Sequence, residues 1–190
     1  MKVGVLALQG AFREHCWMLE GCGAAAVEIR KPAELDEVAG LVIPGGESTT
    51  IGKLMAEWGL MDKIKARAAQ GMRVYGTCAG MILLAKDIIN SSQPRLGLMD
   101  ITVRRNAFGR QRESFEAQMT VPEFGAKPVK AVFIRAPYIE EAGQGITVMA
   151  KVHDKIVIAR QDNILVTAFH PELTQDDRIH KYFISMINKD

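Results

Sequence analysis

The sequence has few cysteines and no long hydrophobic run, and each absence excludes a class of protein. Only three of the 190 residues are cysteines, Cys16, Cys22 and Cys78. That number is too small, and odd, for a disulfide framework. The apolar run at residues 3–8 is far shorter than the ~20 residues that cross a membrane as a helix. We therefore expect a cytoplasmic protein in a reducing environment, without membrane attachment.

The sequence also lacks an excess of charge of one sign and a metal-binding pattern. Its formal net charge is +2, from 24 Lys and Arg against 22 Asp and Glu. No broad field that would attract nucleic acid or a membrane surface is implied. The spacing of Cys16 and Cys22 does not match a zinc knuckle. We interpret both as small buried hydrophobic residues.

The first half of the chain alternates short apolar runs with helical patterns. Strands are predicted at residues 3–8, 26–29, 41–43 and 73–76, and helices at residues 12–22, 49–58, 60–70 and 79–86. Strands that are nearly continuous in apolar residues and are linked by helices predict a parallel sheet with both faces covered.

The second half of the chain changes character. Short strands are predicted at residues 102–104, 115–120, 129–133, 147–152, 155–160 and 165–168, and a last helix at residues 175–187. Turn residues, including those at 141–145, separate these runs, which favours antiparallel additions to the parallel sheet. No linker rich in Pro, Gly or Ser divides the halves. We expect residues 1–190 to form one domain.

A Gly-x-Cys-x-Gly motif joins the predicted strand at 73–76 to the helix after it. A tight strand-to-helix turn strains the backbone of its central residue, here Cys78, and exposes the side chain. Gly76 and Gly80 remove β-carbons that would collide around the turn, and the helix start favours a thiolate. The motif indicates a nucleophile, although a small cysteine packed between two glycines has the same pattern.

A His-Pro-Glu sequence follows the strand predicted at 165–168. Residues two apart in an extended segment point the same way, and Pro171 favours an extended His170. A carboxylate beside an imidazole fixes its tautomer and stabilises its protonated form. Because active sites of parallel sheets lie at the carboxyl ends of strands, we expect Cys78, His170 and Glu172 to meet there. The other histidines, His15, His153 and His180, are assigned ordinary structural or surface roles.

A Pro-Gly-Gly-Glu-Ser-Thr loop at residues 44–49 leaves the strand predicted at 41–43 and enters a helix. Its glycines allow backbone amides to approach a substrate, so the amides of Gly46 and Ala79 are candidate oxyanion donors. Such glycines also occur in simple turns, and amides at a helix start can bind phosphate. The sequence has no Gly-Lys-Ser/Thr segment, which excludes a P-loop.

These motifs and their order resemble the class I, triad-type glutamine amidotransferases. Further blocks are similar to the glutaminase subunit of pyridoxal 5′-phosphate synthase, at residues 4–15, 44–49, 76–80, 105–111, 133–137 and 169–173. The triad motifs belong to the superfamily. The Leu-Gln-Gly-Ala, Arg-Asn-x-Phe-Gly-Arg-Gln and Phe-Ile-Arg-Ala-Pro sequences are typical of the vitamin B6 branch. The resemblance implies a three-layer α/β/α fold of flavodoxin-like type, with a mostly parallel central sheet.

The resemblance also implies a reaction. Glutamine would be hydrolysed to glutamate and ammonia through a thioester, with Cys78 as nucleophile, His170 as acid and base, and Glu172 as its partner. It implies glutamine contacts from Gly46, Glu47, Ser48, Arg105, Ile134 and Arg135. By their own chemistry, either arginine can pair with a carboxylate and Glu47 with an ammonium group, although surface salt bridges are equally ordinary for them. No metal or cofactor is expected.

Free ammonia would be protonated and lost in water, so a partner that consumes it is expected. The resemblance implies a (β/α)₈-barrel pyridoxal 5′-phosphate synthase subunit in a hetero-oligomeric complex. Another synthase, such as imidazole glycerol phosphate synthase, is an alternative partner. Further alternatives are a redox or repair protein with a cysteine elbow and a catalytically silent binding subunit. The late His-Pro-Glu sequence and the complete triad argue against these two.

An electrophilic glutamine analogue should label Cys78 and spare Cys16 and Cys22, because only the elbow is expected to present a nucleophile to substrate. Peptide mass spectrometry after labelling measures the modified positions. Labelling spread evenly over the three cysteines would contradict the elbow interpretation.

Overall fold

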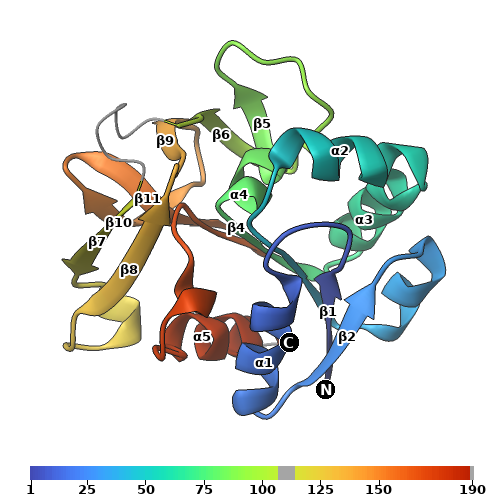
Figure 1. Ribbon diagram of the computed structural model, residues 1–190, viewed down its shortest axis with the longest axis horizontal. Coiled ribbons are helices and arrows are strands. Elements are labelled where there is room, and N and C mark those ends of the chain that lie inside the picture. Colours follow the sequence, from blue (N-terminus) through green and yellow to red (C-terminus); the bar gives the residue numbers. More distant parts are fainter. Residues whose placement is uncertain (107–113, 189–190) are drawn as a thin grey trace.

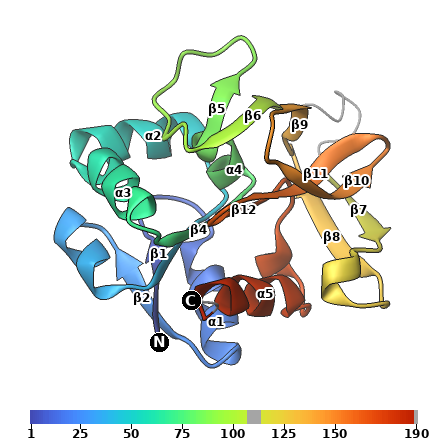
Figure 2. The ribbon, with the colours of Figure 1, turned by 180° about the vertical axis from the view of Figure 1, so that it is seen from behind.

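The computed structural model describes residues 1–106 and 114–188. A central sheet lies between two layers of helices, and Figures 1 and 2 show this arrangement from opposite sides. One face of the sheet is covered by α1 (Phe12–Gly21) and α5 (Arg178–Ile187). The other face is covered by α2 (Ser48–Glu57), α3 (Leu60–Ala69) and the short α4 (Ala79–Leu84).

Five neighbouring strands of the sheet are parallel. Their order is β2 (Ala25–Ile29), β1 (Lys2–Leu6), β3 (Gly40–Ile43), β4 (Arg73–Thr77) and β12 (Ile164–Thr167). In register, Ile43 pairs with Gly76, and Thr77 pairs with Thr167. The carboxyl ends of β3, β4 and β12 therefore lie at one edge, and the segments that follow them begin side by side.

The rest of the sheet is mostly antiparallel. Beyond β12 lie β11 (Lys155–Gln161), β9 (Tyr138–Ala142), β6 (Met99–Arg104) and β5 (Ala85–Ile88), and β10 (Thr147–Val152) pairs with β11. Strands β7 (Ser114–Met119) and β8 (Val129–Ile134) form a separate antiparallel pair. Short 3₁₀ helices are η1 (Pro32–Glu37), η2 (Pro122–Phe124) and η3 (Pro171–Leu173). The predicted fold class, a mostly parallel sheet with antiparallel additions between helices, is confirmed.

Some element boundaries were predicted wrongly. The helix predicted at 79–86 ends at Leu84, and Ala85 begins β5, which pairs with β6. The turn predicted at 141–145 is partly strand, since β9 runs to Ala142 and pairs with β6 and β11. In both cases pairing with distant strands overrides the local pattern.

The interpretation of Cys16 and Cys22 as buried residues was also wrong. Both thiols are only partly buried. Partial burial nevertheless raises the pKa of the Cys16 thiol to about 11, and nearby Glu28 and Glu20 act in the same direction. Burial also raises the pKa of the Cys22 thiol, so neither thiol has the environment of a reactive cysteine.

Helix α5 shows how the core is formed. The apolar spacing predicts that Ile179, Phe183, Met186 and Ile187 face inward; the first three are buried against the sheet, whereas Ile187 is only partly buried. His180 is also fully buried, which the apolar pattern did not reveal. Within the described residues, no helix is both long and apolar enough to cross a membrane.

Gly80→Ala should destabilise the fold, because a β-carbon there would lie 2.1 Å from the carbonyl oxygen of Ile43. Overpacking of this kind costs roughly 1–3 kcal/mol, and each kcal/mol lowers the Tm of a chain of this size by about 2–4 °C. Thermal unfolding followed by circular dichroism measures the change. Gly21→Ala is the control, since its β-carbon would meet nothing within 4 Å. Equal Tm values for the two variants would contradict the packing argument.

Candidate active site

Cys78 lies at the tight turn between β4 and α4. Its backbone has φ 48° and ψ −102°, a left-handed conformation that costs a non-glycine residue on the order of 1–3 kcal/mol. Its N–H donates a hydrogen bond to the carbonyl oxygen of Thr167 at 2.8 Å, which ties the turn to β12. A β-carbon at Gly76 would lie 2.6 Å from the carbonyl carbon of Gly80. The strained elbow and the need for both flanking glycines agree with the sequence prediction, but the predicted exposure of the side chain was wrong, because Cys78 is only 8% exposed.

His170 and Glu172 form a buried pair directly after β12. Nδ1 of His170 lies 2.7 Å from Oε1 of Glu172, and the two residues are only 8% and 6% exposed. The backbone N–H of His170 donates to the carbonyl oxygen of Val132 on β8 at 2.9 Å. The segment is not extended as predicted, because η3 begins at Pro171. The 3₁₀ turn, rather than strand alternation, brings the carboxylate to the imidazole.

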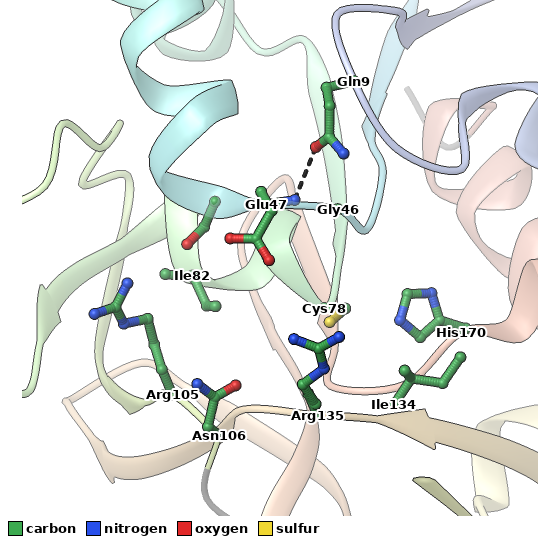
Figure 3. Close-up of a pocket in the computed structure, with 11 residues that line it drawn as sticks. Gln9, Gly46, Glu47, Cys78, Ile82, Arg105, Asn106, Ile134, Arg135 and His170 are labelled. Carbon is green, nitrogen blue, oxygen red and sulfur yellow. Dashed lines mark hydrogen bonds between the residues drawn. The ribbon is translucent and has the colours of Figure 1, made fainter. Parts of the chain in front are cut away.

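The Cys78 thiol and the His170 ring face the same pocket, and Figure 3 shows the sulfur and the imidazole side by side within it. The side chains of both residues lie against Gly45. A β-carbon at Gly45 would lie 2.3 Å from Cε1 of His170 and 3.4 Å from Cβ of Cys78. The absence of a side chain at Gly45 therefore allows the sulfur and the imidazole to approach each other.

The electrostatics of the site favour a protonated imidazole beside an ionised carboxylate. Burial alone would lower the pKa of His170, but hydrogen bonds and negative charge from Cys78 and Glu172 outweigh burial and raise the pKa to about 10. Burial alone would raise the pKa of Glu172, but His15 and His170 outweigh it and hold the pKa below its ordinary value. At neutral pH, His170 can therefore give up a proton while Glu172 stabilises its positive charge.

These shifts also link the stability of the fold to pH. His170 has a raised pKa, so its contribution is complete below pH 6.5 and is lost as pH rises through about 10. Glu172 has a lowered pKa, so its contribution is present above pH 4.5 and is lost as pH falls below that value. The pair therefore stabilises the folded state most between these two ordinary pKa values.

The pocket has a volume of about 320 Å³, at the small end of the range for small-molecule sites. It brings together all six residues for which the sequence suggested glutamine contacts. The lining consists of Gln9, Gly46, Glu47, Ser48, Cys78, Ile82, Arg105, Asn106, Ile134, Arg135 and His170. Ala79 is the first residue of α4, so its N–H has no acceptor within that helix. Of the 105–111 block, residues 107–111 lie outside the described part of the chain.

Three of the seven non-glycine residues with positive φ in the described part of the chain line this pocket. Asn106 and Arg135 have φ values of 47° and 42°, and Cys78 has 48°. All three line the pocket. Non-glycine residues adopt such conformations only when the surrounding structure fixes them, and they gather at functional sites.

Sequence analysis did not predict two glutamines that support the site. The side-chain oxygen of Gln9 accepts the N–H of Glu47 at 2.8 Å, as Figure 3 shows. The side-chain oxygen of Gln93 accepts from Arg105 Nη1 at 2.9 Å and from Ser48 Oγ at 3.2 Å. Gln9 follows β1 at the edge that carries the site, so its position was a usable signal. Gln93 lies between β5 and β6 with no pattern to mark it.

No group of three or more His, Cys, Asp or Glu side chains in residues 1–106 and 114–188 is arranged to hold a metal ion. The described site consists of a thiol, an imidazole–carboxylate pair, backbone amides at two loops, and charged side chains around a small pocket. Such a set can perform nucleophilic acyl transfer, in which the thiol attacks and the imidazole moves protons.

Comparison with known proteins identifies relatives over the whole length of the chain. Residues 5–189 match the SNO glutamine amidotransferase family. A protein of Carboxydothermus hydrogenoformans named pyridoxal 5′-phosphate synthase subunit PdxT is 60% identical over 189 residues, which cover 100% of this chain and 99% of the relative. The protein of the same name from Pelotomaculum thermopropionicum is 62% identical over 97% of this chain and 94% of its own length.

Solved structures agree with these relatives. A crystal structure described as a glutamine amidotransferase is 48% identical, with a TM-score of 0.94 over 98% of both chains. A glutamine amidotransferase structure from Thermotoga maritima has a TM-score of 0.62 at 14% identity, over 100% of this chain and 84% of that one, which supports the fold alone. The predicted family is confirmed, and the redox-protein alternative is not supported.

Glu172→Gln should lower the pKa of His170 from about 10, because the amide keeps the shape of the side chain but removes its negative charge. NMR titration of isotope-labelled histidine rings measures this pKa. Glu140→Gln is a matched control, since the Glu140 carboxylate pairs with Arg104 at 2.8 Å outside the pocket. A His170 titration midpoint that is the same in Glu172→Gln as in the wild type would contradict the coupling.

Proposed function

We propose, since this chain belongs to the SNO glutamine amidotransferase family, that it hydrolyses the side-chain amide of L-glutamine, with Cys78 as nucleophile. The observation that carries this proposal is the convergence of Cys78 with the buried pair His170–Glu172 at one pocket. Residues 1–190 act as one glutaminase domain in the cytoplasm. The relatives named as PdxT support a role as the glutaminase subunit of a pyridoxal 5′-phosphate synthase.

The first half of the reaction forms a thioester. A protonated imidazole beside a sulfur stabilises the thiolate, which is the attacking form. The Cys78 sulfur attacks the carboxamide carbon of glutamine, and a carbon–sulfur bond forms. His170 then donates its proton to the amide nitrogen as the carbon–nitrogen bond breaks, so ammonia leaves. Glu172 keeps the imidazole oriented and stabilises its positive charge until that proton is given up.

The second half hydrolyses the thioester. Neutral His170 removes a proton from water, and the hydroxide attacks the thioester carbon. The carbon–sulfur bond breaks, glutamate leaves, and Cys78 returns as the thiolate beside protonated His170. In both halves the carbonyl oxygen becomes negative, and the backbone amides of Gly46 and Ala79 are the proposed donors. A single oxyanion donor is typically worth roughly 3–4 kcal/mol of barrier.

The charged groups around the pocket suit an amino acid. Arg105 or Arg135 can pair with the α-carboxylate of glutamine, and the Glu47 carboxylate with its α-ammonium group. Ser48 and the exposed side of Ile134 complete the proposed contacts. Gln93 holds both Arg105 and Ser48 through its side-chain oxygen, so one buried amide can fix two of the proposed binding groups.

The proposed partner is inferred from the need to use the ammonia that the reaction releases. The proposed chemistry releases ammonia, and the named relatives are subunits of a synthase. We propose that a (β/α)₈-barrel synthase subunit receives the ammonia in a hetero-oligomeric complex and uses it to make pyridoxal 5′-phosphate. Delivery to another synthase, such as imidazole glycerol phosphate synthase, has no support from these relatives.

Cys78→Ala should reduce ammonia release from glutamine to background, both alone and with a pyridoxal 5′-phosphate synthase subunit present, because no other group at the pocket can form the thioester. A coupled glutamate dehydrogenase assay measures the ammonia. Cys22→Ala is the matched control and should keep wild-type rates, since this thiol does not line the pocket. Ammonia release by Cys78→Ala at the wild-type rate would overturn the nucleophile assignment.

A further inference from the structure

Behind the His170–Glu172 pair lies a second set of buried histidines. His15 on α1 and His180 on α5 are both 0% exposed. Nδ1 of His15 lies 2.9 Å from Nε2 of His180. Nε2 of His15 lies 3.1 Å from Oγ1 of Thr77 and 3.3 Å from Oε2 of Glu172. Helix α1 thus brings the imidazole of His15 to the carboxylate oxygen that His170 does not use, and α5 places His180 behind His15.

The carboxylate oxygen that faces His15 needs a donor. Within the described residues, Oε2 of Glu172 has no hydrogen-bond partner, although the side chain is fully buried. A buried, ionised oxygen without a donor is costly. The Nε2 atom of His15, shared between Thr77 and Glu172, is placed to bring a proton to it.

The proton positions in this cluster follow from the contacts. If His15 carries its proton on Nε2, that N–H donates to Oγ1 of Thr77, with Oε2 of Glu172 3.3 Å from the same nitrogen, and Nδ1 accepts from Nε2–H of His180. Nδ1 of His180, which has no partner within the described residues, is then an unprotonated acceptor. The opposite assignment would set a lone pair of His15 against the carboxylate and bury an unpaired N–H on His180. The first assignment is therefore favoured.

Both imidazoles are neutral in this arrangement. Burial is the main cause that lowers the pKa of His15, and it lowers the pKa of His180 to about 3. The charged groups that act on His15 are Glu172 and Glu14, which raise its pKa, and His170, which lowers it. For His180 the neighbours are His15, which would lower its pKa if it were protonated, and Glu172, which raises it. The ring of Tyr75 also packs at their edge.

The charge state of His15 determines its effect on the Glu172 carboxylate. A charged donor at this place would cancel the negative charge of Glu172, which the protonated His170 needs. A neutral N–H orients the carboxylate and leaves its charge available to the catalytic imidazole. His180 in turn determines which nitrogen of His15 carries the proton.

We propose that His15 is a positioning residue for the glutaminase reaction, which directs a neutral N–H at Glu172 and thereby orients the His170–Glu172 pair, with His180 setting its tautomer. The proposal rests on the function proposed above. It assigns to two buried histidines a role in turnover in addition to their packing.

Two amide variants of His15 separate this role from packing. The amide nitrogen of His15→Gln reaches the place of Nε2, whereas that of His15→Asn reaches only the place of Nδ1. We expect His15→Gln to keep kcat within about threefold of the wild type. We expect His15→Asn to lose roughly 10–100-fold in kcat, the size of loss seen when outer-shell partners of metal ligands are removed. KM should change less than about twofold, because His15 does not line the pocket.

The pH profile gives a second readout. Without its donor, the Glu172 carboxylate is less stable, so its pKa rises and the acid limb of kcat moves to higher pH in His15→Asn. A purely structural defect would lower kcat by the same factor at every pH. His180→Gln is the matched comparison, because its amide nitrogen reaches the place of Nε2 of an equally buried imidazole, can still donate to Nδ1 of His15 and so keeps the tautomer of His15. It should lower kcat by less than about fivefold and leave the acid limb in place.

Folding of each variant is checked by circular dichroism, and Cys78→Ala is run in the same ammonia assay. A folded His15→Asn with wild-type kcat and an unmoved acid limb, beside an inactive Cys78→Ala, would overturn this inference alone. Equal losses in His15→Gln and His15→Asn, with no shift in the pH profile, would also overturn it. Activity that persists in Cys78→Ala would instead overturn the proposed function.

Discussion

The buried contact between His170 and Glu172 is the interaction on which the rest of the site depends. A carboxylate with so little exposure remains ionised only if positive charge or donors face it, and His170 supplies both at 2.7 Å. The same contact raises the pKa of the imidazole, so that a proton is available beside Cys78. The stability of the folded state and the proposed chemistry therefore both depend on the His170–Glu172 pair, which η3 holds in place.

The parallel sheet places this pair beside the cysteine, because the register between β4 and β12 aligns the strands that precede them. Thr77 and Thr167 are aligned at the ends of β4 and β12, so the segments that carry Cys78 and His170 begin at the same level of the sheet. Gly45 then lies against the side chains of His170 and Cys78, and Gly80 against the backbone of Ile43, so the segments after β3 and β4 can pack closely. The strained φ values of Cys78 and Arg135 at the pocket are the local cost of this convergence.

Much of this arrangement could be predicted from the sequence, for physical reasons. The apolar runs before residues 44, 78 and 170 predicted strands whose carboxyl ends share an edge, and the glycines around Cys78 predicted the elbow. The errors arose where distant pairing decided the outcome. Ala85 begins a strand instead of continuing the predicted helix, because it pairs with β6. Gln93 accepts a hydrogen bond from Arg105, but it lies in a loop whose sequence has no recognisable pattern.

The sequence by itself determined the fold class, the family and most of the residues around the pocket, because these depend on local periodicity and on motifs that the chain carries intact. Only the tertiary structure decided the environment of each titratable group. His15 and His180 looked ordinary because nothing in a helical pattern distinguishes a buried imidazole from an exposed one. The contact of His180 with His15, and of His15 with Glu172, depends on the packing of α1 and α5, which are separated by most of the chain, against the same face of the sheet.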